Sequence, residues 1–109
     1  MMRYKLNHKY GAKQVEYDGI KFPSKLEGEY YKQLKWRQHC GEVLFFLRQV
    51  PFHLPGNTKY VVDFVEFLSD GTIEFVDVKG METDMFKLKK AQVEDVYPIT
   101  IKVVKNVKS

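Results

Sequence analysis

The sequence is poor in the residues that build disulfides and soft-metal sites. Cys40 is the single cysteine among 109 residues, which excludes an intramolecular disulfide and a cysteine metal cluster and indicates a reducing, cytoplasmic setting. The three histidines, His8, His39 and His53, lack the spacing of zinc ligands. A glycine-rich phosphate loop is also missing, and nothing marks a serine or cysteine nucleophile triad. We therefore expect neither a histidine zinc site nor a nucleotide cofactor.

Long apolar segments are missing as well. The first ten residues lack an apolar signal segment, and the longest apolar run, Val43–Leu47, is far too short to span a membrane. There is no repeat and no low-complexity stretch. A chain of this length buries roughly two thirds of its unfolded surface, which is enough for one modest core. We therefore expect a single domain over residues 1–109, with residues 1–13 as a basic N-terminal arm and no membrane association.

Positive charge is in excess, and it is unevenly distributed. The net charge is +4, and the basic residues gather near the two ends of the chain, at Arg3, Lys5, Lys9, Lys13, Lys87, Lys89, Lys90, Lys102, Lys105 and Lys108. Basic ends favour an anionic partner, usually a nucleic acid. The alternative is a solvated surface that only favours solubility.

Local patterns predict a hairpin and a helix in the first part of the chain. Asp18-Gly19 lies between alternating apolar residues, which predicts a short hairpin over residues 14–22. Ser24 is a good N-cap, and Glu27 three residues later completes a capping-box pattern. We therefore predict a helix from about Ser24 to Cys40.

The rest of the chain has the pattern of three strands, a helix and a last strand. The strands are expected over residues 42–54, 60–68, 72–80 and 99–107, and Pro51 bends the first of them or confines it to a sheet edge. A helix over residues 83–97, capped by Thr83 or Asp84, joins the third strand to the last one, which predicts a parallel crossover. The predicted fold class is α/β, with a mixed sheet flanked by helices in the order αβββαβ after a short N-terminal hairpin.

Two acids and a lysine lie on strands that otherwise look like core. Asp77 and Lys79 share one face of their strand, and Asp63 lies opposite Asp77 if the hairpin is symmetric about the turn at 69–71. Two carboxylates about 5 Å apart on adjacent strands destabilise each other unless a cation lies between them. The alternatives are a same-face ion pair of Asp77 with Lys79 and an ordinary edge-strand acid at Asp63.

A hard divalent cation would supply the missing positive charge. Mg²⁺ takes oxygen ligands, usually one or two carboxylates together with waters and substrate phosphate. Lys79 lies one alternation beyond Asp77, and its ammonium group can stabilise the charge that develops on a phosphate under attack. The sequence therefore predicts a magnesium site on this strand pair.

The same residues resemble the motif of a known nuclease superfamily. Asp63, a hairpin and then Asp77-Val78-Lys79 resemble the PD-(D/E)XK motif of restriction-endonuclease-like nucleases, although Val62 replaces the proline of the motif. The αβββαβ core of that superfamily has the element order predicted above. After its first dozen residues the chain is also similar to small phage-encoded proteins with this core, whose pattern resembles DGIKFPSKLEGEYY, Y-x-x-D-F, D-V-K-G and T-x-x-F-K-L-K here.

The resemblance implies a set of site residues. The catalytic residues would be Glu27, Asp63, Asp77 and Lys79, and the ligands of Mg²⁺, which Mn²⁺ can replace, would be Asp63, Asp77, the backbone carbonyl of Val78 and Glu27. Gln49 matches a strand position that faces the metal site in similar nucleases. The alternatives are that Glu27 only completes the capping box and that Gln49 is a polar residue beside a turn.

Several basic and aromatic residues have two interpretations. The residues expected to contact DNA are Lys87, Lys89, Lys90, Arg3 and Lys5, and the alternative for the lysines is a solvated helix face. Tyr30, Tyr31 and Trp36 are expected in the core rather than as platforms on which bases stack.

The predicted function is Mg²⁺-dependent endonucleolytic cleavage of DNA at the P–O3′ bond, which leaves a 5′-phosphate. One small domain offers few base contacts, so recognition of branched or Holliday-junction DNA is expected, in phage recombination or replication in the host cytoplasm. A junction resolvase needs two sites and hence a homodimer. The alternatives are non-specific nicking by a monomer and a catalytically inactive module of the same fold that binds nucleic acid or a partner.

Overall fold

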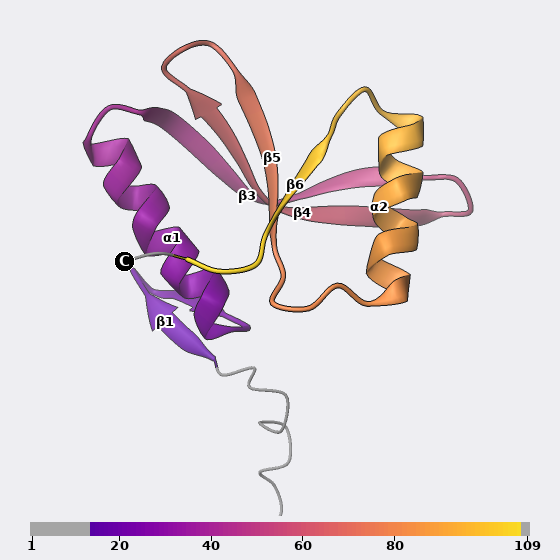
Figure 1. Cartoon of the computed structure of the whole chain (residues 1–109), viewed down its shortest axis with the longest axis horizontal. Coiled ribbons are helices and arrows are strands. Elements are labelled where there is room, and N and C mark those ends of the chain that lie inside the picture. The colour runs from indigo at the N-terminus through magenta and orange to yellow at the C-terminus, as the bar shows by residue number, and fades with distance from the viewer. Residues whose placement is uncertain (1–13, 108–109) are drawn as a thin grey trace, which may run out of the picture.

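The computed structural model describes residues 14–107, and their elements follow the predicted order (Figure 1). The elements are β1 (Val15–Tyr17), β2 (Ile20–Phe22), α1 (Lys25–His39), β3 (Val43–Leu54), β4 (Thr58–Leu68), β5 (Ile73–Val78), α2 (Asp84–Val96) and β6 (Ile101–Val104). Strand β6 is shorter than the predicted range of 99–107. The order of hairpin, helix, three strands, helix and strand is confirmed.

Short-range interactions explain where these elements begin and turn. Asp18 and Gly19 both have positive φ, 54° and 76°, as the tight turn between β1 and β2 requires. The Ser24 hydroxyl accepts a hydrogen bond from the backbone N–H of Glu27 at 3.1 Å and caps α1. Thr83, one of the two predicted caps of α2, accepts from the Phe86 N–H at 3.1 Å. Each of these interactions lies within four residues of chain, which is why the sequence pattern could predict it.

The main sheet is mixed and has the order β3-β4-β5-β6. The first three strands pair antiparallel, and β5 pairs parallel with β6 across the connection through α2, as predicted. β3 is an edge strand, and its residue Pro51 pairs with Val61 without ending the strand. The described residues therefore form an α/β structure with a four-stranded sheet, a two-stranded hairpin and two helices.

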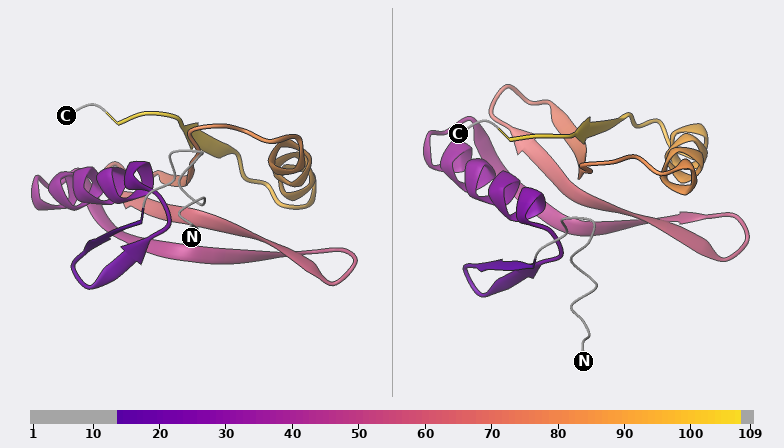
Figure 2. Two further views of the ribbon diagram at one scale, coloured as in Figure 1. Left: turned by 90° about the horizontal axis from the view of Figure 1, so that it is seen from below. Right: turned by 60° about the horizontal axis from the view of Figure 1, so that its bottom comes forward.

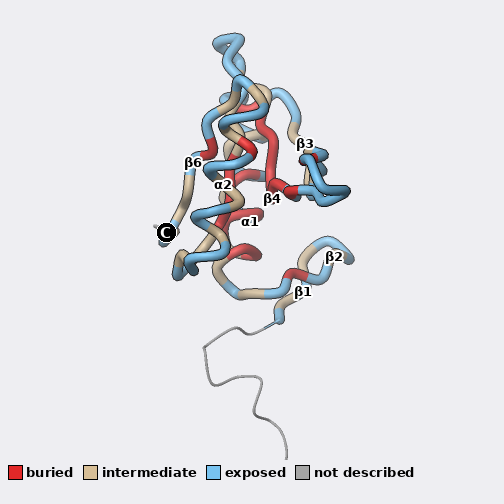
Figure 3. The backbone as a smooth tube through the Cα atoms, turned by 90° about the vertical axis from the view of Figure 1, so that its right-hand side faces the viewer, coloured by how far each residue is buried: buried red, intermediate tan, exposed pale blue. Residues whose placement is uncertain are grey.

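Alternate residues of β5 contribute to two separate hydrophobic clusters. Val76 and Val78 pack with residues of α1, whereas Phe75 packs with residues of α2. Because neighbouring residues of a strand point to opposite faces, the two helices flank opposite faces of the sheet at β5. The longest run of buried residues, 62–66, lies in β4 (Figure 3).

The long β3–β4 hairpin changes faces in its middle. Val62 belongs to the cluster at α2 and Phe64 to the cluster at α1, although strict alternation would give both residues the same face. Opposite this point Gln49 has a positive φ of 53°, which a glutamine rarely adopts. The hairpin thus extends from α1 to α2 and contributes to the packing of both helices (Figure 2).

One expectation about the core is wrong, and one buried acid was not anticipated. Trp36 is 64% exposed, because it lies on the outer side of α1 and stacks on His39, whereas Tyr30 and Tyr31 are buried as expected. Glu66, which the sequence analysis did not single out, is fully buried in the same core. It accepts hydrogen bonds from the Tyr30 hydroxyl and from Arg37 Nη1, the latter at 3.0 Å. This cluster meets the requirement that a buried charge be paired.

Neither helix in the part of the chain that the structure describes is long and apolar enough to cross a membrane.

Candidate active site

The two acids on the central strands lie beside each other. The β4–β5 pairing begins at Phe64 and Val76, so Asp63 and Asp77 are the next residues on the two strands. The Asp63 N–H donates to Asp77 Oδ1 at 2.9 Å, and the Val78 N–H donates to Asp63 Oδ2 at 2.9 Å. Each carboxylate therefore takes the place of a strand carbonyl just past the end of the ladder. The predicted juxtaposition of Asp63 and Asp77 is confirmed.

Both acids are buried, and burial changes the pKa of Asp77. Asp63 is 8% exposed and Asp77 is 2% exposed. Burial raises the pKa of the Asp77 carboxyl, and the nearby charge of Asp63 adds to this, while hydrogen bonds from Tyr60 and from the Asp63 backbone and the charge of Lys79 lower it. A cation close to Asp77 would stabilise its ionised form.

Tyr60 is a site residue that the sequence analysis missed. Its hydroxyl donates a hydrogen bond to Asp77 Oδ2, and burial together with this bond raises the pKa of the Tyr60 phenol. Strict alternation along β4 would direct Tyr60 and Asp63 to opposite faces. The change of face at Asp63 brings Tyr60 to the α2 side of the sheet. There the centroid of its ring lies 6.3 Å from the centroid of the Phe86 ring. The pattern Y-x-x-D contains Tyr60 and Asp63. Strict alternation along the strand, however, predicts that their side chains lie on opposite faces and so gives no reason to place Tyr60 in the site.

Glu27 comes to the same place from α1, 36 residues before Asp63 in the chain. It is 4% exposed, and its Oε2 atom has no hydrogen-bond partner within residues 14–107. Burial raises the pKa of Glu27 from 4.5 to about 7, helped by the charges of Asp63 and Asp77 and opposed by those of Arg48 and Lys79. The helix cap uses the backbone N–H of Glu27, so capping does not account for the buried oxygen. Glu29, in contrast, points away and accepts from the Tyr17 hydroxyl at 3.1 Å.

Lys79 follows Asp77 by two residues and lies half-buried at the end of β5. Its ammonium nitrogen lies 5.3 Å from the centroid of the Phe86 ring on α2, within the range of a cation–π interaction. Its positive charge lowers the pKa values of Glu27 and Asp77. Lys79 is thus held beside the acids by an aromatic ring, and an incoming anion need not displace another anion from it.

Two residues of β3 complete the surroundings of the acids. Gln49 Nε2 donates to Asp63 Oδ1 at 3.3 Å, so the residue that the sequence singled out does reach Asp63. Arg48, which the sequence analysis missed, stacks its guanidinium over the Phe22 ring at 4.8 Å and leaves its buried Nε without a partner in the described chain. No local pattern distinguishes Arg48 from any other strand arginine, because only the packing of α1 against β3 brings it to Glu27.

A pocket of about 270 Å³ opens beside Asp77 and Lys79. Its walls are Lys59, Tyr60, Val61, Asp77, Lys79, Thr83, Met85, Phe86 and Lys89. Among the lysines predicted to contact DNA, Lys89 lines this pocket, Lys87 is exposed and Lys90 pairs with Glu94 at 3.1 Å. Arg3 and Lys5 lie outside the described residues. The pocket therefore brings Asp77 together with three lysines, Lys59, Lys79 and Lys89.

A family model described as "Protein of unknown function (DUF1064)" matches residues 7–109. The chain belongs to this family. No curated protein and no solved structure matches the chain. The match to DUF1064 includes every acid and lysine of the site, but it assigns no activity to them.

Whether this DUF1064 site suits a metal ion depends on its oxygen atoms. Within residues 14–107 no group of three or more His, Cys, Asp or Glu side chains is placed so that it could form a metal cage by itself. Mg²⁺ does not require such a cage, because one or two carboxylates with waters suffice. An ionised carboxylate has about four lone-pair sites. The hydrogen bonds that Asp63 and Asp77 accept therefore leave some of their lone pairs free to bind a cation. Asp63 and Asp77 thus offer oxygen atoms of the kind that a hard divalent cation takes.

Proposed function

We propose that the chain is a Mg²⁺-dependent DNA endonuclease with a restriction-endonuclease-like αβββαβ core. One observation carries the proposal: Asp63 and Asp77 are buried side by side near Lys79, and their charges raise the pKa of the buried Glu27, whose Oε2 has no hydrogen-bond partner in the described chain. Buried carboxylates that influence one another are costly unless a cation compensates them. The element order and the lysine-rich pocket also support this function.

The residues that would hold the cation are Asp63, Asp77 and the backbone carbonyl of Val78, with Glu27 holding it through a water. When bound, Mg²⁺ supplies a Lewis acid that withdraws charge from the scissile phosphate. Lys79 binds a nonbridging oxygen of that phosphate and stabilises the negative charge of the pentacovalent transition state. Its place over the Phe86 ring fixes the ammonium group for this task.

Glu27 is suited to move a proton in the reaction. Its buried Oε2 has no hydrogen-bond partner in the described chain, so it can accept the proton of the attacking water. The water oxygen forms a bond to phosphorus, the P–O3′ bond breaks, and the leaving O3′ takes a proton from solvent. The products are a 5′-phosphate and a 3′-hydroxyl, and recognition of branched or junction DNA by a homodimer belongs to the same proposal.

A second candidate is a catalytically inactive nucleic-acid-binding module of the same fold. The observation in its favour is that all four carboxylate oxygens of Asp63 and Asp77 already accept hydrogen bonds. In this alternative the two acids would serve to end the β4–β5 ladder and would bind no cation.

Cleavage assays with matched variants distinguish the two functions. Labelled single-stranded, duplex, flap and four-way-junction DNAs are incubated with the protein and either Mg²⁺ or Mn²⁺. Asp77→Asn and Lys79→Ala are expected to lower the cleavage rate about 100-fold or more. Asp70→Asn is the control, since Asp70 lies in the exposed β4–β5 turn and an amide oxygen can still accept from Thr72. If Asp77→Asn cuts DNA as fast as the wild type, the assignment of the site is wrong.

A further inference from the structure

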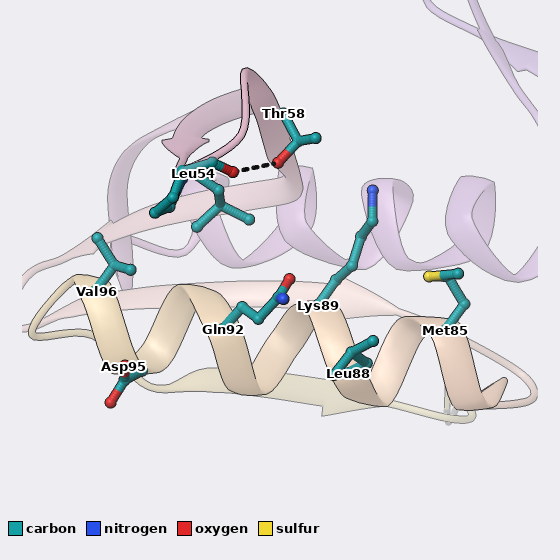
Figure 4. Close-up of a pocket in the computed structure, with 9 residues that line it drawn as sticks. Leu54, Thr58, Met85, Leu88, Lys89, Gln92, Asp95 and Val96 are labelled. Atoms are coloured by element: carbon teal, nitrogen blue, oxygen red, sulfur yellow. Dashed lines mark hydrogen bonds between the residues drawn. The ribbon is translucent and has the colours of Figure 1, made fainter.

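A second pocket lies between α2 and the tip of the β3–β4 hairpin. It has a volume of about 420 Å³, and its walls are Leu54, Pro55, Thr58, Met85, Leu88, Lys89, Gln92, Asp95 and Val96 (Figure 4). Met85, Leu88 and Val96 are 61%, 55% and 48% exposed, so α2 presents an apolar stripe to solvent here. The hairpin side is held by its turn, in which the Thr58 hydroxyl donates to the Pro55 carbonyl at 3.2 Å.

This pocket adjoins the candidate active site. Met85 and Lys89 belong to the walls of both pockets, so the two pockets adjoin along α2, one at the hairpin tip and the other at Asp77 and Lys79. In Figure 4 the Lys89 side chain rises from α2 toward the hairpin side, between Gln92 and Met85. We call the two adjoining pockets together the α2 groove. Whatever occupies it ends next to the acids.

The charges of the α2 groove differ from one end to the other. Lys59, Lys79 and Lys89 surround the end at the active site, where Asp77 is buried beneath them. Beyond Lys89 the far end is apolar except for Thr58, Gln92 and the exposed Asp95. A ligand that matches this layout carries negative charge next to the cleavage position and apolar surface beyond it.

We propose that the α2 groove holds an unpaired DNA strand next to the phosphate that is cut. Lys59 and Lys89 bind phosphates of this strand, and Met85 and Leu88 contact the faces of its bases. Base faces are accessible only where bases are unstacked, so an apolar wall beside phosphate-binding lysines selects single strands over duplex. This inference rests on the proposed function and deepens it, because it names the substrate class: DNA that has an unpaired segment at the cleavage position.

The test is a binding measurement that needs no cleavage. The full-length protein is titrated, in the presence of a chelator, into a fluorescently labelled single strand and into the same strand within a duplex, and anisotropy is recorded over a range of salt concentrations. The variants are Lys59→Ala, Lys89→Ala and Leu88→Ser. Lys35→Ala, on the exposed side of α1, is the control.

Each lysine variant should weaken single-strand binding and lower the slope of log affinity against log salt by about 0.7, the value for one phosphate contact on a single strand. Leu88→Ser should weaken single-strand binding without changing this slope, because it removes an apolar contact and no charge. Duplex binding should change little in any variant. Since Leu88 is largely exposed, its replacement leaves the core intact and keeps the test independent of folding.

Three results would overturn the inference: equal weakening on single strand and duplex, no effect of the three variants, or no binding of any DNA. Failure of the nuclease proposal gives a different result. A protein that binds single strands through the groove but cuts no DNA refutes the proposed function and leaves the groove assignment standing. A protein that cuts flap and duplex at equal rates, unaffected by Leu88→Ser, keeps the nuclease and refutes the groove.

Discussion

Replacing Glu27 by glutamine tests whether a third acid is buried in the site. A tenfold difference in an equilibrium constant is worth about 1.4 kcal/mol, so a pKa raised from 4.5 to about 7 costs about 3 kcal/mol of folding free energy once the carboxyl is ionised. Between these two pH values the unfolded chain releases the proton while the folded chain retains it. The unfolded state then binds fewer protons, so stability falls as the pH rises through this window.

Glu27→Gln removes this ionisation and should reverse its cost. At pH 8, with a chelator present, the variant should be more stable than the wild type by up to about 3 kcal/mol, which is on the order of 10 °C in Tm for a chain of this size. At pH 4.5 the folded wild type carries a protonated Glu27, so the two proteins should melt at similar temperatures. Thermal unfolding followed by circular dichroism at both pH values measures the difference.

Glu16→Gln is the matched control, because Glu16 is exposed on β1 and its replacement changes the net charge by the same amount. This control should melt like the wild type at both pH values. The reasoning fails if Glu27→Gln is no more stable than the wild type at pH 8, or if the gain at pH 8 equals the gain at pH 4.5. Either outcome would mean that no desolvated carboxylate stands at this position.

Three further predictions concern the metal and the packing. In wild-type protein Mg²⁺ or Mn²⁺ should raise the Tm, because a ligand that binds only the native state stabilises it, and Asp77→Asn should abolish this rise. Gly28→Ala should cost about 1–3 kcal/mol in denaturant unfolding, because an added Cβ would lie 2.4 Å from Val15 Cγ2, and an unchanged midpoint would contradict this packing. Arg37→Ala should cost about 3 kcal/mol by leaving the buried Glu66 without its cation, whereas Arg37→Lys should cost less; equal losses would show that the charge is unimportant.

The pairing of Asp63 with Asp77 was predictable because it depends on few residues. A turn centred on Asp70 fixes the register of β4 and β5, and the two-residue period of a strand then fixes the faces. The same short-range logic predicted the caps at Ser24 and Thr83. These features are set by neighbouring residues, whatever the rest of the chain does.

The other residues of the site could not be predicted from short-range patterns. Tyr60 reaches Asp77 because the β3–β4 hairpin changes faces at Asp63, opposite which Gln49 adopts a positive φ, whereas Arg48 comes to Glu27 through the packing of α1 against β3. Alternation assumes a regular strand and therefore gives the wrong face beyond such a point. For Trp36, helical periodicity could not tell an apolar position in the core from one on the outer side of α1.

The sequence by itself determined the order of the elements, their caps and turns, and the opposition of two acids and a lysine at the end of one strand pair. Only the tertiary structure decided that Glu27 is buried beside them with an oxygen left unpartnered in the described chain, and that α2 and the hairpin tip form a groove leading to the same place. The physical reason is range. Hydrogen-bonded turns and periodic faces act over a few residues, whereas the meeting of α1, α2 and the hairpin depends on how the two hydrophobic clusters pack as wholes.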